Sequence, residues 1–251
     1  MKAPEIFSVA ADEIAAGVPD REYRRLLGLP SDLALPGDLA DGAQRARQWY
    51  AVHGRPFVAT RRVALRDIGA VSVTLGTGDV LTSLALADRL REGGAHALVV
   101  LAASAGHEVA YEAALLWAAG RLDEAYFLDR FAAVVTEGLV SWASARLCRI
   151  CAPRQEQLLP HLSPGCSHWD LADQHRLMGL LAHSAADSCG PLTLLASGAL
   201  HPQHSLLAAL GVTHRAFVAT RESSCCRCDL DPCSFRRMPL ASSCSHPCSK
   251  P

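Results

Sequence analysis

One stretch of the chain combines a tight turn with the start of a helix. Ser163, Pro164 and Gly165 form the turn, and Asp170 precedes an apolar segment with helical spacing over residues 171–181. Pro fixes one backbone angle and Gly frees the next, so such a turn can bring main-chain N–H and C=O groups close to a ligand. Asp170 is well suited to be the N-cap of the helix. The sequence therefore predicts a loop followed by a helix, which by itself is either a ligand-binding loop or a plain connector.

The C-terminal segment is the second place where residue types and spacing indicate chemistry. Six of the ten cysteines lie in it, at positions 225, 226, 228, 233, 244 and 248. Cys225, Cys228 and Cys233 offer three thiolates on a turn-rich segment, and a Cys-X-X-Cys pair bends readily around a zinc ion or an iron–sulfur cluster. Cys244 is the favoured fourth ligand, with Cys226, His246 and Cys248 as alternatives. Metal binding is the preferred interpretation; a redox-active thiol set and inert thiols are the others.

Composition limits the class of protein. The chain has 251 residues, half of them apolar, which is enough for one larger domain or two small ones. The net charge is −1 with basic and acidic residues well mixed, so we expect no nucleic-acid partner. Glu5, Asp12 and Glu13 interrupt the first apolar runs, and the longest such run, 97–103, is too short to cross a bilayer. We therefore expect a soluble cytoplasmic protein without a membrane partner.

Helical and strand patterns alternate along the chain without a regular repeat. Helices are predicted over 5–28 (one or two short ones), 39–50, 77–91, 106–119, 122–151, 170–181 and 204–210. Strands are predicted over 57–65, 69–75, 95–103, 192–196 and 215–220. This mixture predicts an α+β fold rather than a doubly wound one. The shift to a Ser- and Cys-rich composition near Arg221 divides the chain into an α+β domain over 1–220 and a metal-binding tail over 221–251.

Several segments together resemble a known family. The pattern Ser-Pro-Gly-X-X-X-Trp-X-Leu-X-X-Gln over 163–174, followed by an apolar helix, is similar to the signature of the activation domain of cobalamin-dependent methionine synthase in its free-standing form. Four further segments match that family in the same order, at 23–28, 98–109, 126–137 and 225–237. The resemblance covers most of the chain and implies a mixed fold around a largely antiparallel sheet.

The resemblance also implies a binding site for S-adenosylmethionine. It assigns the ligand-binding loop to His161, Ser163, Gly165 and Cys166, and an acidic ligand-binding residue on a helix to Glu137. A half-buried carboxylate can pair with the ammonium or sulfonium group of that ligand. The chain departs from the family at two of these positions, where His161 replaces an Arg and Cys166 replaces an aromatic residue. A neutral His is a poorer carboxylate clamp than Arg, and the loss of the aromatic ring removes a stacking surface.

The function implied by the resemblance is that of an enzyme component rather than a complete enzyme. Such a module binds S-adenosylmethionine and docks on a corrinoid methyltransferase or another cobalamin-binding protein for reductive remethylation, with a reductase as electron donor. The Asp-X-His-X-X-Gly pattern of cobalamin carriers does not occur in this sequence, so we expect the partner to hold the cobalamin. Two alternatives remain open: a metal or iron–sulfur electron-transfer accessory that uses the cysteine tail, and a partner-binding module that has lost its ligand.

Overall fold

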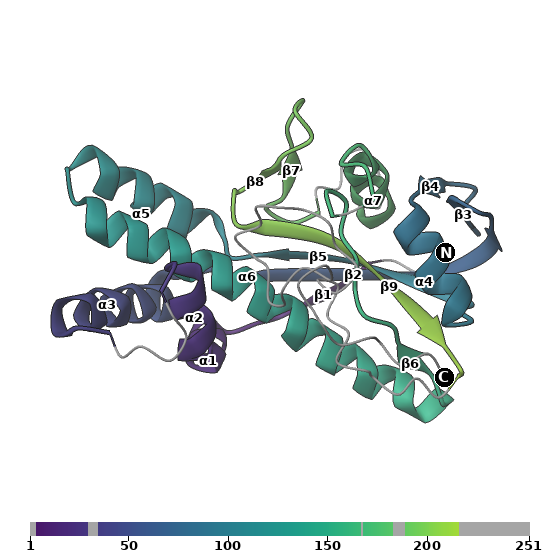
Figure 1. The fold of residues 1–251 in the computed structure, drawn as a ribbon, viewed down its shortest axis with the longest axis horizontal. Helices are drawn as coiled ribbons and strands as arrows, with labels where there is room; N and C mark the ends of the chain where they lie inside the picture. The colour runs from purple at the N-terminus through teal and green to yellow at the C-terminus, as the bar shows by residue number, and fades with distance from the viewer. Residues whose placement is uncertain (1–3, 30–34, 167, 183–188, 216–251) are drawn as a thin grey trace, which may run out of the picture.

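The computed structural model describes residues 4–29, 35–166, 168–182 and 189–215. The described chain has the expected α+β fold, in which helices cover a seven-stranded antiparallel sheet (Figure 1). The strand order is β4-β3-β2-β5-β9-β6, and β1 also pairs with β2. The predicted cysteine ligands of the tail and most of the predicted strand 215–220 lie outside the described residues, so the division at residue 220 stays a prediction.

The strands of the sheet are β1 (Glu5–Phe7), β2 (Phe57–Ile68), β3 (Ser72–Leu75), β4 (Val80–Thr82), β5 (Ala97–Ser104), β6 (Gln157–Leu158) and β9 (Ser205–Thr213). A separate two-stranded ribbon consists of β7 (Thr193–Leu194) and β8 (Leu200–His201). The helices are α1 (Ala11–Gly17), α2 (Asp20–Leu26), α3 (Gly37–His53), α4 (Leu84–Glu92), α5 (His107–Ala118), α6 (Leu122–Cys151), the 3₁₀ turn η1 (Ala152–Arg154) and α7 (Asp173–Leu181).

The centre of the sheet is β5, which confirms the predicted central strand. All eight of its residues are buried, and it pairs with β2 on one side and β9 on the other. Its continuous run of Ala, Leu and Val is what a strand buried on both faces requires. Because both long neighbours are held along nearly the whole of β5, the segments that follow and precede these strands have fixed positions at the two ends of the sheet.

Each face of the sheet packs against its own hydrophobic core. Val99 and Leu101 of β5 pack with α1, α2, α3, α5 and the 30-residue helix α6. Leu98 and Val100 point the other way and pack with α4, α7 and the segment that connects β6 to α7. The alternation follows from the two-residue period of a strand. In Figure 1, α7 and α6 accordingly lie on opposite sides of the sheet.

Three sequence-based predictions were wrong in detail. The segment 204–210 was predicted as a helix, but its residues 205–210 belong to β9, because pairing along β5 outweighs the helix propensity of a Leu- and Ala-rich segment. The predicted helix 77–91 starts only at Leu84, after β4 has paired with β3. The predicted helical segment 5–28 begins with β1 before α1 and α2 follow.

Among the described helices, none has both the length and the apolar character that a membrane crossing requires.

Candidate functional site

The Ser-Pro-Gly loop consists of two consecutive turns. The N–H of Cys166 donates to the carbonyl of Ser163 at 3.1 Å, and Gly165 at the third position of this turn has φ +88°. Pro at the second position and a positive φ at the third define a type II turn. The N–H of Trp169 then donates to the carbonyl of Cys166 at 3.0 Å, which closes the second turn, with His168 at φ +59°. The predicted tight turn is confirmed, and Gly165 is exposed at its tip.

Main-chain hydrogen bonds fix this loop at both of its ends. Before the turn, Leu162 and Ala209 of β9 exchange N–H···O=C bonds of 3.0 and 2.8 Å. After it, Trp169 bridges to Ser83, whose hydroxyl also donates to the carbonyl of His168 at 3.1 Å. The loop is therefore anchored to β9 on one side and to the residue that caps α4 on the other. A ligand that contacts this backbone would meet groups that are already in place.

A buried carboxylate holds the second half of the loop. Asp173, with 2% of its surface exposed, accepts hydrogen bonds from the N–H of Thr82 at 2.7 Å and from the indole N–H of Trp169 at 2.8 Å. Arg176, one turn along α7, pairs with its other oxygen. This role of Asp173 was not predicted from the sequence. The available signal was the spacing of Trp169 and Asp173, because residues four apart lie on one side of a helical turn.

The start of α7 differs from the prediction in one respect. The helix begins at Asp173 rather than directly after Asp170, because the preceding residues form shorter i→i+3 turns. Asp170 still accepts the N–H of Ala172 at 2.7 Å, as a capping carboxylate does. In the first turn of α7, the side-chain oxygen of Gln174 is buried and has no hydrogen-bond partner within the described part of the chain. Such an acceptor costs about 1–3 kcal/mol if it stays unpaired, so it is a place where a ligand donor would be favourable.

The structure brings four of the five predicted ligand-binding residues together. His161, Ser163, Gly165 and Cys166 lie within one continuous segment around the first turn. Glu137 lies on α6, which packs against the other face of the sheet. Its carboxylate is 3.9 Å from the guanidinium of Arg25 on α2. The predicted partnership of Glu137 with the loop therefore requires a ligand that reaches around the sheet.

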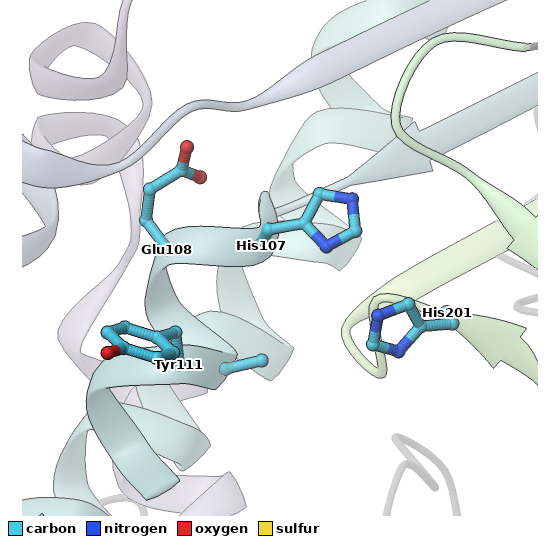
Figure 2. A pocket seen from close by; sticks show the side chains of 5 residues that line it. His107, Glu108, Tyr111 and His201 are labelled. Atoms are coloured by element: carbon cyan, nitrogen blue, oxygen red, sulfur yellow. The ribbon is translucent and has the colours of Figure 1, made fainter. Parts of the chain in front are cut away.

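A shallow hollow lies where β5 ends and α5 begins. His107, Glu108, Ala110 and Tyr111 line it from α5, and His201 of β8 lines it from the other side (Figure 2). The two imidazole rings are 5.2 Å apart, and His107 Nε2 lies 2.9 Å from the carbonyl of Pro191, so the protonated Nε2 donates there. Sequence analysis did not group these residues, because α5 and β8 are far apart along the chain. The hollow is open to solvent, and four of its five lining residues carry polar side chains, so it is a depression of the surface and not an enclosed reaction centre.

Comparison with known proteins supports the fold. No protein-family model matches the chain, and no curated protein sequence matches it. Among solved structures, the crystal structure of the MetH reactivation domain bound to AdoHcy is similar, with a TM-score of 0.62 and 12% sequence identity. The match covers 83% of this chain and 78% of that chain. The described chain thus has a fold similar to that of a methionine synthase reactivation domain.

Proposed function

We propose that this chain is an S-adenosylmethionine-binding module that acts together with a cobalamin-dependent methyltransferase. The observation that carries the proposal is the anchored type II turn over Ser163–Cys166, with Gly165 exposed at its tip and a positive φ. The structurally similar reactivation domain is described as bound to AdoHcy, which differs from S-adenosylmethionine only by the methyl group and its positive charge. Fold and loop thus support the same class of ligand.

The residues around the turn have the chemistry that this ligand needs. Gly165 lets a ligand approach the backbone closely, because no Cβ blocks the way, and main-chain carbonyl groups suit the hydroxyl and amino donors of the adenosine. The N–H groups of Gly165 and Cys166 already donate within the loop, to Trp169 and Ser163, and hold its shape. Gln174 supplies a buried acceptor without a partner in the described chain, which suits an N–H donor such as an ammonium or an amino group. His161 is half-buried and directly precedes the anchored Leu162. Its proposed role is to bind the carboxylate of S-adenosylmethionine.

When bound, S-adenosylmethionine supplies an activated methyl group. The protein's contribution is to bind the ligand, to orient it by fixed backbone groups and to present it to a partner that holds the cobalamin; in such a role, positioning provides the rate enhancement. A corrinoid methyltransferase is the proposed partner, and the open hollow beside α5 is the kind of surface that such a contact uses. A reductase is the proposed source of the electron.

The test is a calorimetric titration of S-adenosylmethionine into the full chain. We expect a dissociation constant near the micromolar range, which corresponds to a binding free energy on the order of −8 kcal/mol. Two variants locate the site. His161→Arg restores a guanidinium fork for the ligand carboxylate and should tighten binding about tenfold, since a charge-assisted hydrogen bond contributes about 1.5–3 kcal/mol. His175→Arg adds the same charge at an exposed position on α7 and is the matched control, with unchanged binding expected.

The outcomes separate the alternatives. Tighter binding by His161→Arg and unchanged binding by His175→Arg support the proposal. No heat from the wild-type chain and from His161→Arg alike would contradict it and would favour a module without this ligand. An equal gain from both variants would mean that the added charge acts at long range, and the loop would not be the site.

A further inference from the structure

Three residues with metal-ligating side chains meet where β5 begins and β9 ends. His96 immediately precedes β5, His214 immediately follows β9, and Glu156 lies between η1 and β6. One nitrogen or oxygen of each lies within 4.8 Å of the others, and His96 Nε2 is 3.0 Å from Glu156 Oε1. We call these three residues the histidine cluster. It is separate from the loop over Ser163–Trp169 and has no part in the proposed function.

The sheet fixes the backbone of all three positions. The N–H of His96 donates to the carbonyl of Val212 at 3.0 Å, which continues the β5–β9 ladder by one residue. Gln157 pairs with Thr213, so Glu156 and His214 stand next to a paired position on adjoining strands. Three segments distant in sequence therefore present their side chains to one place without any movement of the strands, which is the pre-organisation that a metal site needs.

The side chains have the donor chemistry of a zinc-type site. Two imidazoles and one carboxylate suit Zn²⁺ and the neighbouring divalent ions of the first transition row. The Glu156 side chain is only 4% exposed, and its hydrogen bonds from Arg62 hold its pKa down at about 2, against the opposite effect of burial. The carboxylate is therefore ionised at neutral pH, as ligation demands.

Arg62 determines how a metal ion would share this carboxylate. Its guanidinium donates to Glu156 Oε1 at 2.5 Å and to Oε2 at 2.6 Å. The Nη2 that donates to Oε1 also lies 3.1 Å from His96 Nε2, so the guanidinium now stands between these two ligand atoms. An ion bound between His96 and Oε1 would displace Nη2 and leave Nη1 on Oε2, where it orients the ligand carboxylate. The ring of His214 is exposed and stacks on that of His96 with centroids 4.5 Å apart. A ring nitrogen of His214 already lies within 4.8 Å of the ligand atoms of His96 and Glu156, and rotation of this exposed ring out of the stack would direct it at the same ion.

We propose that His96, Glu156 and His214 bind a divalent late transition-metal ion of the Zn²⁺ class, with water completing a four-coordinate site. Such an ion would link the residue before β5, the residue after β9 and the residue before β6. The site would stabilise the folded state by binding it and not the unfolded chain.

Co²⁺ is the probe for this site, because its spectrum reports the ligand type. The full chain, stripped of metal by a chelator, is titrated with Co²⁺ in three forms: wild type, His214→Ala and His175→Ala. Cysteine ligands give intense thiolate-to-cobalt charge-transfer bands, whereas a nitrogen and oxygen site gives weaker ligand-field bands alone. Thiolate bands from the cysteine tail should be equal in the three forms. Apart from these, we expect the wild type and His175→Ala to show ligand-field bands of a nitrogen and oxygen site, and His214→Ala to bind at that site at least tenfold more weakly.

Thermal unfolding keeps the test independent of folding defects. His214 is exposed, so His214→Ala should unfold at the wild-type temperature in the absence of metal. Zn²⁺ should raise the unfolding temperature of the wild type more than that of His214→Ala. Equal Co²⁺ spectra and equal Zn²⁺ shifts in wild type and His214→Ala would overturn the proposal and leave the histidine cluster as an ion-paired closure of the sheet.

Discussion

The loop over Ser163–Trp169 and the histidine cluster of His96, Glu156 and His214 use opposite means to present polar groups. The loop presents main-chain groups, held by backbone positions with positive φ at Gly165 and His168. The histidine cluster presents side chains, whose backbone is ordinary sheet and whose charges are balanced by Arg62. The first arrangement suits a large organic ligand that is recognised by shape and hydrogen bonds. The second suits a small ion recognised by charge and donor type.

The most damaging change to the loop alone is Asp173→Asn. The amide cannot accept from both Thr82 and Trp169 while pairing with Arg176, so we expect a loss of roughly 3 kcal/mol in the free energy of unfolding. Urea denaturation measures this loss. Binding of S-adenosylmethionine should weaken with it, whereas Co²⁺ binding to the histidine cluster should persist in the folded fraction. If the folded variant bound neither S-adenosylmethionine nor Co²⁺, the loop and the histidine cluster would not be independent.

An ion pair outside both regions provides the reference for pH dependence. Asp129 on α6 lies 2.8 Å from His204 Nε2. Burial raises the pKa of Asp129, but the hydrogen bonds from His204 and Arg130 outweigh it and leave the pKa below its ordinary value of 3.8. A lowered carboxyl pKa stabilises the fold above that ordinary value, and this contribution is lost as the pH falls through the folded-state pKa.

Asp129→Asn should therefore cost about 1–3 kcal/mol near neutral pH, and the cost should shrink below about pH 4. Denaturation curves of wild type and Asp129→Asn between pH 3 and pH 7 test the sign. A cost that grows toward low pH would contradict the assignment. Because Asp129 contacts neither the loop nor the histidine cluster in the described structure, ligand affinities of the folded variant should be unchanged.

Gly165→Ala should destabilise the protein less than Asp173→Asn, because it acts only on the backbone conformation of the turn. A side chain at φ +88° is unfavourable, and the new Cβ would lie 3.2 Å from Leu171 Cδ1. We expect a loss of roughly 1–2 kcal/mol and weaker ligand binding. Gly179→Ala is the matched control, because Gly179 lies inside α7 with open space around its Cβ position; it should stabilise the protein by about 0.5–1 kcal/mol. Equal effects of the two substitutions would show that the turn conformation is not demanding.

Glu137 gives the smallest predicted effect on stability. Its carboxylate is partly exposed and 3.9 Å from Arg25, so Glu137→Gln should change the free energy of unfolding by less than about 1 kcal/mol. Titration with S-adenosylmethionine decides its role. An unchanged affinity agrees with its place on α6 against the other face of the sheet, whereas a clear loss would bring Glu137 into the binding site.

Local patterns predicted the parts of the molecule whose cause is local. The Ser-Pro-Gly turn depends on the angles of Pro164 and Gly165 themselves, and β5 is apolar from Ala97 to Ala103; both were predicted. The strand β9 was predicted as a helix because its pairing partner is more than a hundred residues away along the chain. For the same reason the contacts of Asp173 with Thr82, and the meeting of His96, Glu156 and His214, left no pattern at any fixed spacing.

The loop over Ser163–Trp169 is the proposed ligand-binding region, and the proposed function depends on it most. Hydrogen exchange followed by mass spectrometry, with and without S-adenosylmethionine, measures this directly for every described segment. The account predicts slower exchange in peptides that cover residues 162–174, and unchanged exchange in peptides that cover β6 and the residues before β5. Protection confined to other segments, or no protection at a ligand concentration far above micromolar, would contradict it.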